Sequence, residues 1–233
     1  MDYFDGSMTR EQAQAETQRF IVKVYGWMSL ALIITGLVAM WVSSSEFCIR
    51  MLSLGKWVFI GLGILEVVLV AFLAGWIEKM SSKVAALVFI LYSILNGITF
   101  SVIFLIFTTD SIATTFFVTA GTFAIMSIYG YFTQSDLTKI GNFLLMALIG
   151  LIIATVVNLF WFNETLYWIT TYAGVIIFVG LVAYDTQKIK QMNIIGNERT
   201  EEDKKEAIVG ALTLYLDFIN LFLYLLRIFG KRK

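Results

Sequence analysis

Long apolar runs separated by short polar stretches dominate the pattern of this chain. A helix needs about 20 apolar residues to cross a bilayer core about 30 Å thick, and each of these runs is close to that length. Ten-residue segments of alternating polarity, which are typical of transmembrane β-barrels, do not stand out. The pattern predicts seven membrane-spanning helices, at residues 25–42, 57–77, 84–107, 112–131, 143–160, 166–184 and 208–229.

The connections between these runs are short, which favours a single compact domain. We expect a polar N-terminal segment over residues 1–20 and one seven-helix membrane domain over residues 21–233. Of the connections between spans, only residues 186–207 form a long loop in this interpretation. The N-terminal segment lacks the apolar core of a secretory signal peptide.

Positive charges indicate how the chain is oriented. Seven crossings place eleven Lys and Arg residues on the side of the N-terminus and six on the other side, so we expect a cytoplasmic N-terminus. The basic C-terminus, 231–233, then lies outside, against the rule. It would be cytoplasmic if the last apolar segment folded back, but that segment is long enough to cross.

Composition narrows the class of protein. Of 233 residues, 59% are hydrophobic and 15% charged, and the net charge is zero. This excludes a soluble enzyme and a nucleic-acid-binding protein, and makes the lipid bilayer the expected partner. The chain has no histidine and one cysteine, so His-based catalysis and zinc fingers are excluded and no cofactor is expected. Any response to pH must come from carboxyl groups.

Few ionisable residues fall within the predicted spans, and such residues often mark ion pathways. Glu66 lies in the middle of the second span and Asp217 within the seventh. Asp185 lies at the inner end of the sixth and Arg227 near the outer end of the seventh. Lys23, at the edge of the first span, is most simply an anchor whose amine reaches the membrane surface.

A polar stripe runs along the last span. Thr213, Asp217, Asn220, Tyr224 and Arg227 follow one another at spacings of four and three residues, which places them on one face of a helix. The stripe is either a hydrogen-bonded seam that fixes packing or the lining of a path for ions or protons. In both cases we expect this C-terminal helix to be central in the domain.

Asp185 and Asp217 lie on the two helices joined by the inner loop, so their carboxyl groups would meet if the helices extend beyond the membrane. Two carboxylates in a low-dielectric site cannot both ionise at low cost, and the pair would share a proton. Such a pair would act as a pH switch in a chain without histidine. When both groups are ionised, they would offer a weak oxygen site suited to calcium.

Two stretches near the C-terminus, FVGLVAYDTQKIK and GALTLYLDFINLFLYLLRIFG, closely resemble signatures of the Bax inhibitor family, the transmembrane Bax inhibitor motif proteins. The central region, ATTFFVTAGTFAIMSIYGYFTQSDLTKIGNFLLMALIGLIIATVVN, and the first span, VYGWMSLALIITG, also resemble it. The resemblance covers nearly all of the chain from about residue 20 and is closest to bacterial members.

The resemblance implies a seven-helix fold whose last helix is surrounded by the other six, and a pH-sensitive calcium leak. It assigns the family's pH-sensing aspartates to Asp185 and Asp217, and the acidic residue of the second helix to Glu66. It also implies a bacterial plasma (inner) membrane. The chain departs from the family in two places. Ile77 stands where some bacterial members have a latch arginine, and the third helix lacks a common Gly-Pro pair.

Three functional hypotheses follow. The leading one is a multi-pass membrane protein, not an enzyme, that passes calcium or other cations under the control of the Asp185–Asp217 pair. The alternative is a regulator that transports nothing and binds a membrane protease or a protein of a stress or cell-death pathway. A more distant third is an intramembrane hydrolase, because aspartyl intramembrane proteases also carry one aspartate on each of two helices.

Overall fold

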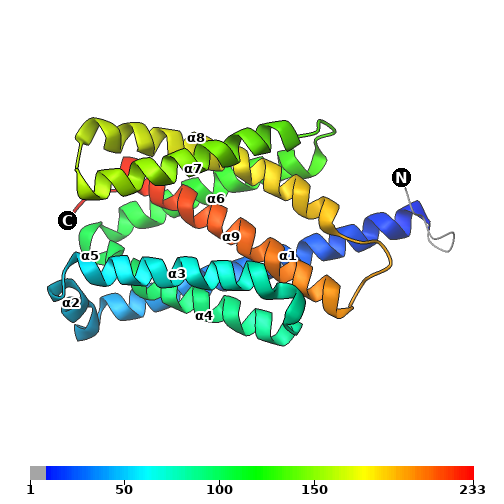
Figure 1. The fold of residues 1–233 in the computed structure, drawn as a ribbon, viewed down its shortest axis with the longest axis horizontal. Coiled ribbons are helices and arrows are strands. Elements are labelled where there is room, and N and C mark those ends of the chain that lie inside the picture. The colour runs from blue at the N-terminus through cyan, green and yellow to red at the C-terminus, as the bar shows by residue number, and fades with distance from the viewer. Residues whose placement is uncertain (1–8) are drawn as a thin grey trace. The chain divides into compact units, whose positions relative to one another are not determined.

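The computed structural model describes residues 9–233, and this part of the chain is almost entirely helical (Figure 1). The helices are α1 (Arg10–Ser43), α2 (Glu46–Ser53), α3 (Lys56–Trp76), α4 (Ser82–Phe100), α5 (Ile103–Ile106), α6 (Thr109–Phe132), α7 (Thr138–Phe160), α8 (Glu164–Met192) and α9 (Glu201–Phe229). A 3-10 turn, Ile77–Lys79, follows α3. The one β feature among these residues is an isolated antiparallel bridge between Phe107 and Arg232.

Seven helical segments within the described residues are long and apolar enough to cross a membrane, which confirms the predicted all-α membrane fold. They differ in how much of their apolar surface the protein covers. In the most apolar window of α3 only 6% of the residues are buried, whereas 67% are buried in that of α9. The exposed apolar faces suit contact with lipid chains. The central position of α9 remains a prediction.

The chain divides into two compact units. The first contains residues up to Phe100 together with Ile189–Leu212, and the second contains Ser101–Lys188 together with Thr213–Lys233. The boundary between Lys188 and Ile189 lies within α8, and the boundary between Leu212 and Thr213 lies within α9. Each of these two helices therefore contributes one part to each unit.

In the first unit, α4 contacts both α1 and α3. Helix α1 starts with a capping box, in which the Thr9 N–H donates to the Gln12 side chain and the Thr9 hydroxyl accepts from the Gln12 N–H. Further along, the Thr35 hydroxyl donates to the Ser93 carbonyl of α4 at 2.9 Å. Gly97 lets α1 and α4 approach closely, because a Cβ there would lie 2.7 Å from that of Val38.

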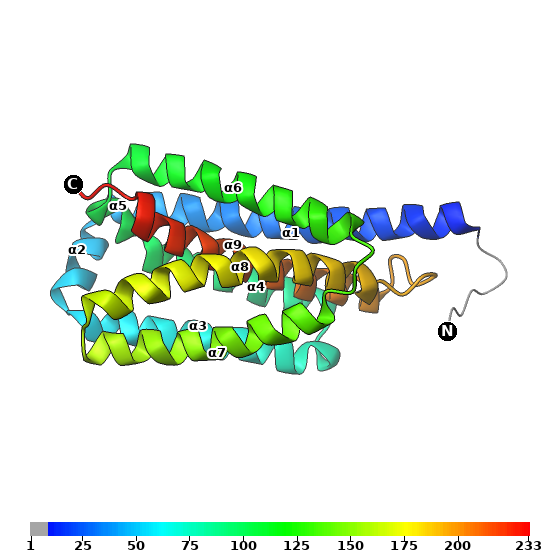
Figure 2. The ribbon, with the colours of Figure 1, turned by 90° about the horizontal axis from the view of Figure 1, so that it is seen from above.

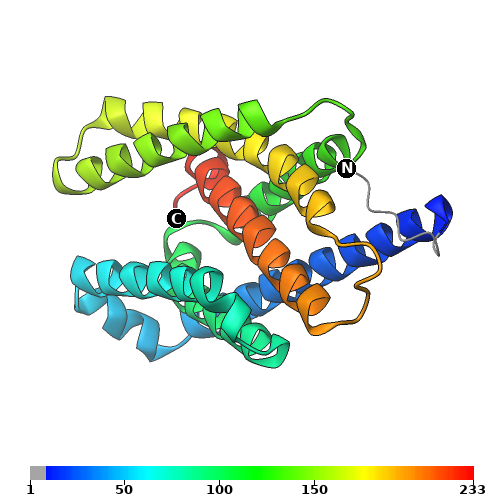
Figure 3. The ribbon, with the colours of Figure 1, turned by 45° about the vertical axis from the view of Figure 1, so that its right-hand side comes forward.

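In the second unit, α7 and α8 run side by side in opposite directions (Figures 2 and 3). An apolar cluster joins them to the C-terminal part of α9, and its members are Leu144 and Leu151 of α7, Ile177, Phe178 and Leu181 of α8, and Leu221, Tyr224 and Leu225 of α9. Helix α6 contacts α9 through Phe116 and Phe123, whose rings each pack edge-on to Phe218 with centroids 5.5 Å apart. Close van der Waals packing of these side chains helps to hold the helices of this unit together, because lipid chains are as apolar as the side chains themselves.

The boundaries differ from the sequence prediction in three places. Helix α1 begins at Arg10, so it runs through most of the expected N-terminal segment, whose residues 1–8 lie outside the described residues. The expected loop over 186–207 is much shorter, because α8 continues to Met192 and α9 begins at Glu201. Polar residues at helix ends extend a helix beyond the membrane core. A prediction based on apolar runs does not include these ends. The expected span over 84–107 is divided between α4 and α5.

Gly130 marks the tightest approach of α6 to α8, because a Cβ there would collide with the backbone carbonyl of Ala183. We expect Gly130→Ala to lower the free energy of unfolding by about 1–3 kcal/mol, since a backbone atom cannot rotate away. Gly121→Ala on the same helix is the matched control, because nothing lies within 4 Å of the place its methyl group would take. It should be neutral or stabilising by up to about 1 kcal/mol. Thermal unfolding in detergent measures both; equal stabilities would contradict the packing described.

Candidate functional site

The structure brings Asp185 of α8 and Asp217 of α9 together within the second unit. Their exposed fractions are 7% and 5%, and the two carboxyl groups share a hydrogen bond. An ionised carboxyl group can only accept hydrogen bonds, so a bond between two carboxyl groups requires a proton on one of them. The geometry therefore fits a pair that holds one proton.

One oxygen of Asp217 makes the need for that proton explicit. Among the described residues, no conventional N–H or O–H donor reaches the buried Oδ2 atom of Asp217. Buried polar atoms nearly always have a hydrogen-bond partner, because leaving one without a partner costs about 1–3 kcal/mol. A proton carried by the pair itself is the donor that its surroundings allow.

The neighbours of the pair are mostly uncharged. Ser127 of α6 lies 3.5 Å from the hydroxyl oxygen of Thr186, the residue after Asp185. Lys188 interacts electrostatically with Asp185 and lies 5.9 Å from the ring centroid of Tyr184. Lys188 thus places a positive charge one turn away from Asp185.

Glu66 belongs to the other unit and does not take part in the aspartate pair. It lies on α3, half-buried, and its carboxylate accepts a 2.6 Å hydrogen bond from the Thr99 hydroxyl of α4. It also interacts electrostatically with the buried Tyr92. This acidic residue therefore has a partner of its own within the first unit.

The remaining residues of the α9 stripe have separate contacts. The Asn220 amide donates to the Leu216 carbonyl of its own helix at 2.8 Å, and Thr213 is half-buried. The Arg227 guanidinium lies over two aromatic rings, 4.8 Å from the centroid of Tyr224 and 5.3 Å from that of Tyr167. Toward its C-terminal end the stripe thus contacts aromatic rings, and its role as a polar path remains a prediction.

A polar network in the first unit was not predicted from the sequence. The first turns of α1 contact the connection between α8 and α9: both carboxylate oxygens of Glu16 accept from the Gly196 N–H, at 3.0 and 3.1 Å. Lys23 pairs with the buried Asp203 at 2.7 Å, where the sequence had suggested a membrane-surface anchor. Gly196 has a φ of +90°, which other residues rarely adopt.

Arg19 and Glu198 add an exposed ion pair to this network, with two hydrogen bonds of 2.9 Å each. The hydrogen bond from Arg19 holds the pKa of the Glu198 carboxyl below its ordinary value. The pair therefore contributes to stability above the ordinary pKa of a glutamate, and this contribution is lost as the pH falls through the lowered pKa. The partners are 179 positions apart, so no local sequence signal could have revealed them.

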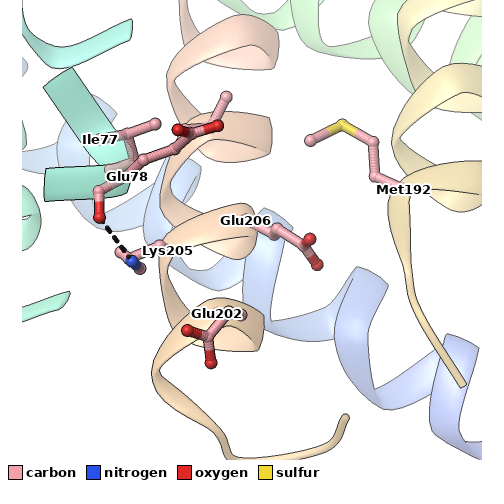
Figure 4. A pocket seen from close by; sticks show the side chains of 7 residues that line it. Ile77, Glu78, Met192, Glu202, Lys205 and Glu206 are labelled. Carbon is pink, nitrogen blue, oxygen red and sulfur yellow. Dashed lines mark hydrogen bonds between the residues drawn. The ribbon is translucent and has the colours of Figure 1, made fainter. Parts of the chain in front are cut away.

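An open pocket of about 460 Å³ lies beside this network, between the turn after α3, the end of α8 and the start of α9 (Figure 4). Glu78, Glu202 and Glu206 line it, together with Lys205, whose amine donates to the Glu78 carbonyl at 3.2 Å. Ile77, which stands where the related latch arginine was expected, also lines it.

Within residues 9–233, no group of three or more acidic, His or Cys side chains is arranged to hold a metal ion. The Asp185–Asp217 pair offers two carboxyl groups, which is fewer oxygen ligands than calcium takes in a stable protein site. Any contact of calcium with the pair is therefore expected to be weak and transient.

Comparisons with known proteins agree on one family. Residues 17–233 match the family model described as "Inhibitor of apoptosis-promoting Bax1". The chain is 49% identical to "Inner membrane protein YbhL" of Escherichia coli (strain K12) over 234 residues, covering all of both chains. It is 44% identical to a protein of Borreliella burgdorferi, covering 92% of this chain and 93% of the relative. It is also 44% identical to protein RP147 of Rickettsia prowazekii, covering 93% and 91%.

The buried ion pair of Lys23 and Asp203 can be tested by removing its cation. Asp203 is 3% exposed, so Lys23→Met leaves a buried carboxylate without its charged partner and should lower the free energy of unfolding by about 1–3 kcal/mol. Arg19→Met, four residues earlier on α1, is the control, because the pair it breaks is exposed and should matter little. Denaturant unfolding in detergent measures both, and equal losses would refute this ranking.

Proposed function

This chain belongs to the Bax inhibitor family, and we propose that it is a multi-pass membrane protein that lets calcium, or other cations, leak down their gradient under the control of pH. The Asp185–Asp217 pair is the proposed control element. The observation that carries the proposal is the burial of two carboxyl groups in mutual hydrogen-bond contact, on two helices long enough to cross the membrane.

The proposed mechanism follows from the protonation of the pair. With one proton, the two carboxyl groups attract each other through a hydrogen bond, and α8 and α9 stay together at this point. When the proton leaves, two like charges face each other in a low-dielectric site and repel. The repulsion favours an arrangement in which α9 shifts and water and cations reach the carboxylates. Two carboxylates then attract calcium weakly enough to release it.

The rest of the stripe on α9 is proposed to line this path. Thr213 and Asn220 flank Asp217 at one turn on either side, and they offer a hydroxyl and an amide to a passing ion. Tyr224 and Arg227 lie beyond them, toward the end of the helix. Glu66, with its own partner Thr99, is proposed to support the fold of the first unit.

We propose a bacterial plasma (inner) membrane as the location, with a cytoplasmic N-terminus. The excess of Lys and Arg on the N-terminal side supports this orientation. The relative from Escherichia coli carries the name of an inner membrane protein.

The proposal predicts that Asp185→Asn and Asp217→Asn each abolish the pH dependence of calcium flux into proteoliposomes. An amide does not ionise, so the variant can never hold two carboxylates in contact and loses the repulsion that drives the proposed response to pH. Asp110→Asn, which removes an exposed carboxylate in the first turn of α6, is the matched control and should keep the pH profile of the wild-type protein. If both pair variants keep that profile, the pair is not the control element.

A regulator of a membrane protease or of a stress pathway is the second candidate, and on that reading the aspartates only fix the structure. Purified wild-type protein in calcium-loaded liposomes separates the two. A leak protein releases calcium without any partner, whereas a pure regulator releases none above empty liposomes. The same preparation, mixed with a labelled membrane peptide, tests for hydrolase activity, which we expect to be absent.

A further inference from the structure

The turn of α8 that carries Asp185 is held in place by contacts with α6, α7 and the connection between them. We call residues 183–187 the Asp185 turn. It lies wholly within the second unit, and α6, α7 and the connection between them approach it. Three contacts hold it.

The first contact is a pair of hydrogen bonds made by one side chain. Gln187, which is 8% exposed, donates from its amide nitrogen to the Ser135 carbonyl at 2.9 Å. Its amide oxygen accepts from the Leu137 N–H at 3.0 Å. Both partners are backbone groups of the connection between α6 and α7, so a single amide fastens α8 to that connection at two points.

The connection is itself braced, so it can act as an anchor. The Ser135 N–H donates to the Thr133 hydroxyl oxygen at 3.3 Å, and the Thr138 N–H donates to the Asp136 carboxylate at 2.9 Å. Leu137 immediately precedes α7, where a helix has N–H groups without partners inside the helix. Gln187 therefore satisfies a helix-end donor that the helix itself cannot satisfy.

The second and third contacts are close approaches of helices. Gly130 of α6 lies against the carbonyl of Ala183, and Gly141 of α7 lies against the ring of Tyr184. In both places a Cβ would overlap the neighbouring atoms. Closely packed backbones leave the Asp185 turn little room to shift.

The surroundings of Asp217 on α9 are different. The next residue, Phe218, packs edge-on to two phenylalanine rings, and Asn220 bonds a carbonyl of its own helix. Apolar contacts are not directional, and they survive small shifts that would break a hydrogen bond. Next to Asp217, Phe218 joins α9 to α6 by ring contacts, and the hydrogen bond of Asn220 stays within α9.

We propose that Gln187 is a positioning residue for the aspartate pair: it fastens the Asp185 turn to the α6–α7 connection and so holds the Asp185 carboxyl group where it meets that of Asp217. This inference rests on the proposed function of the pair. The charged and titratable groups that act on Asp185 are Asp217 of α9 and Lys188 of α8. From α6 and α7, the approaching groups are Ser127, Gly130 and Gly141.

Gln187→Met tests the proposal, because methionine has a similar length and no amide. Purified protein in lipid nanodiscs serves for two measurements: hydrogen exchange of the Leu137 amide, and the pH at which the infrared band of the protonated pair disappears. We expect exchange at Leu137 to rise about tenfold, as for the loss of one hydrogen bond, and the midpoint of the pair to shift. Gln191→Met, on an exposed position four residues along α8, should change neither.

Gln187→Glu separates the two hydrogen bonds. An ionised glutamate still accepts from the Leu137 N–H but cannot donate to the Ser135 carbonyl. At neutral pH this variant should therefore keep the wild-type exchange rate at Leu137 and still shift the midpoint of the pair. It is compared with the wild type alone, so it serves as the test if Gln187→Met does not fold.

The outcomes separate this proposal from the proposed function. Faster exchange at Leu137 with an unchanged midpoint of the pair overturns the positioning role, because Gln187 then only braces the fold. A shifted midpoint in a protein whose wild type shows no calcium flux supports the positioning role and refutes the leak. Unchanged exchange and an unchanged midpoint in both variants overturn the positioning role as well.

Discussion

The cost of keeping two carboxyl groups away from water is the constraint on which the second unit depends. Asp185 and Asp217 are both more than nine-tenths buried. Such a site tolerates one charge with a strong hydrogen bond far better than two charges in contact. The number of protons on the pair therefore decides whether α8 and α9 attract or repel each other there.

The contacts around the pair determine how α8 and α9 are held where the two carboxyl groups attract or repel each other. A small set of close approaches and hydrogen bonds fastens the Asp185 turn, whereas α9 is held next to Asp217 by aromatic contacts. In the proposed mechanism, a change of charge on the pair therefore acts against an Asp185 that is held by its own neighbours. In the first unit, the ion pair of Lys23 with Asp203 and the contact of Glu16 with Gly196 hold the short connection between the same two helices.

Much of the fold follows from the sequence because the bilayer constrains it so strongly. A run of about 20 apolar residues has few alternatives to a helix, and all seven expected spans have a counterpart in the structure. The helix ends were harder to predict. The residues after Asp185 and those before Ile208 are polar, which suggested a loop, yet α8 and α9 continue through them to Met192 and from Glu201.

The site was only partly accessible to sequence reasoning. The lack of histidine directed attention to carboxyl groups, and the spacing on α9 picked out Asp217. Gln187 gave no signal, because a glutamine in a polar stretch is normally exposed and its partners lie about 50 positions away. The partners of Glu16 and Lys23 are about 180 positions away and were equally hidden. Contacts of this kind depend on packing between helices, which local pattern does not encode.

The most direct test of control by the aspartate pair measures two quantities on one proteoliposome sample as the pH is varied. Infrared spectroscopy reports the protonated carboxyl band of the pair, identified by its absence in Asp217→Asn, and a trapped calcium dye reports the leak. We predict that the leak rises over the same pH interval in which the band disappears. A leak that changes with pH while the band stays constant would contradict control by the pair.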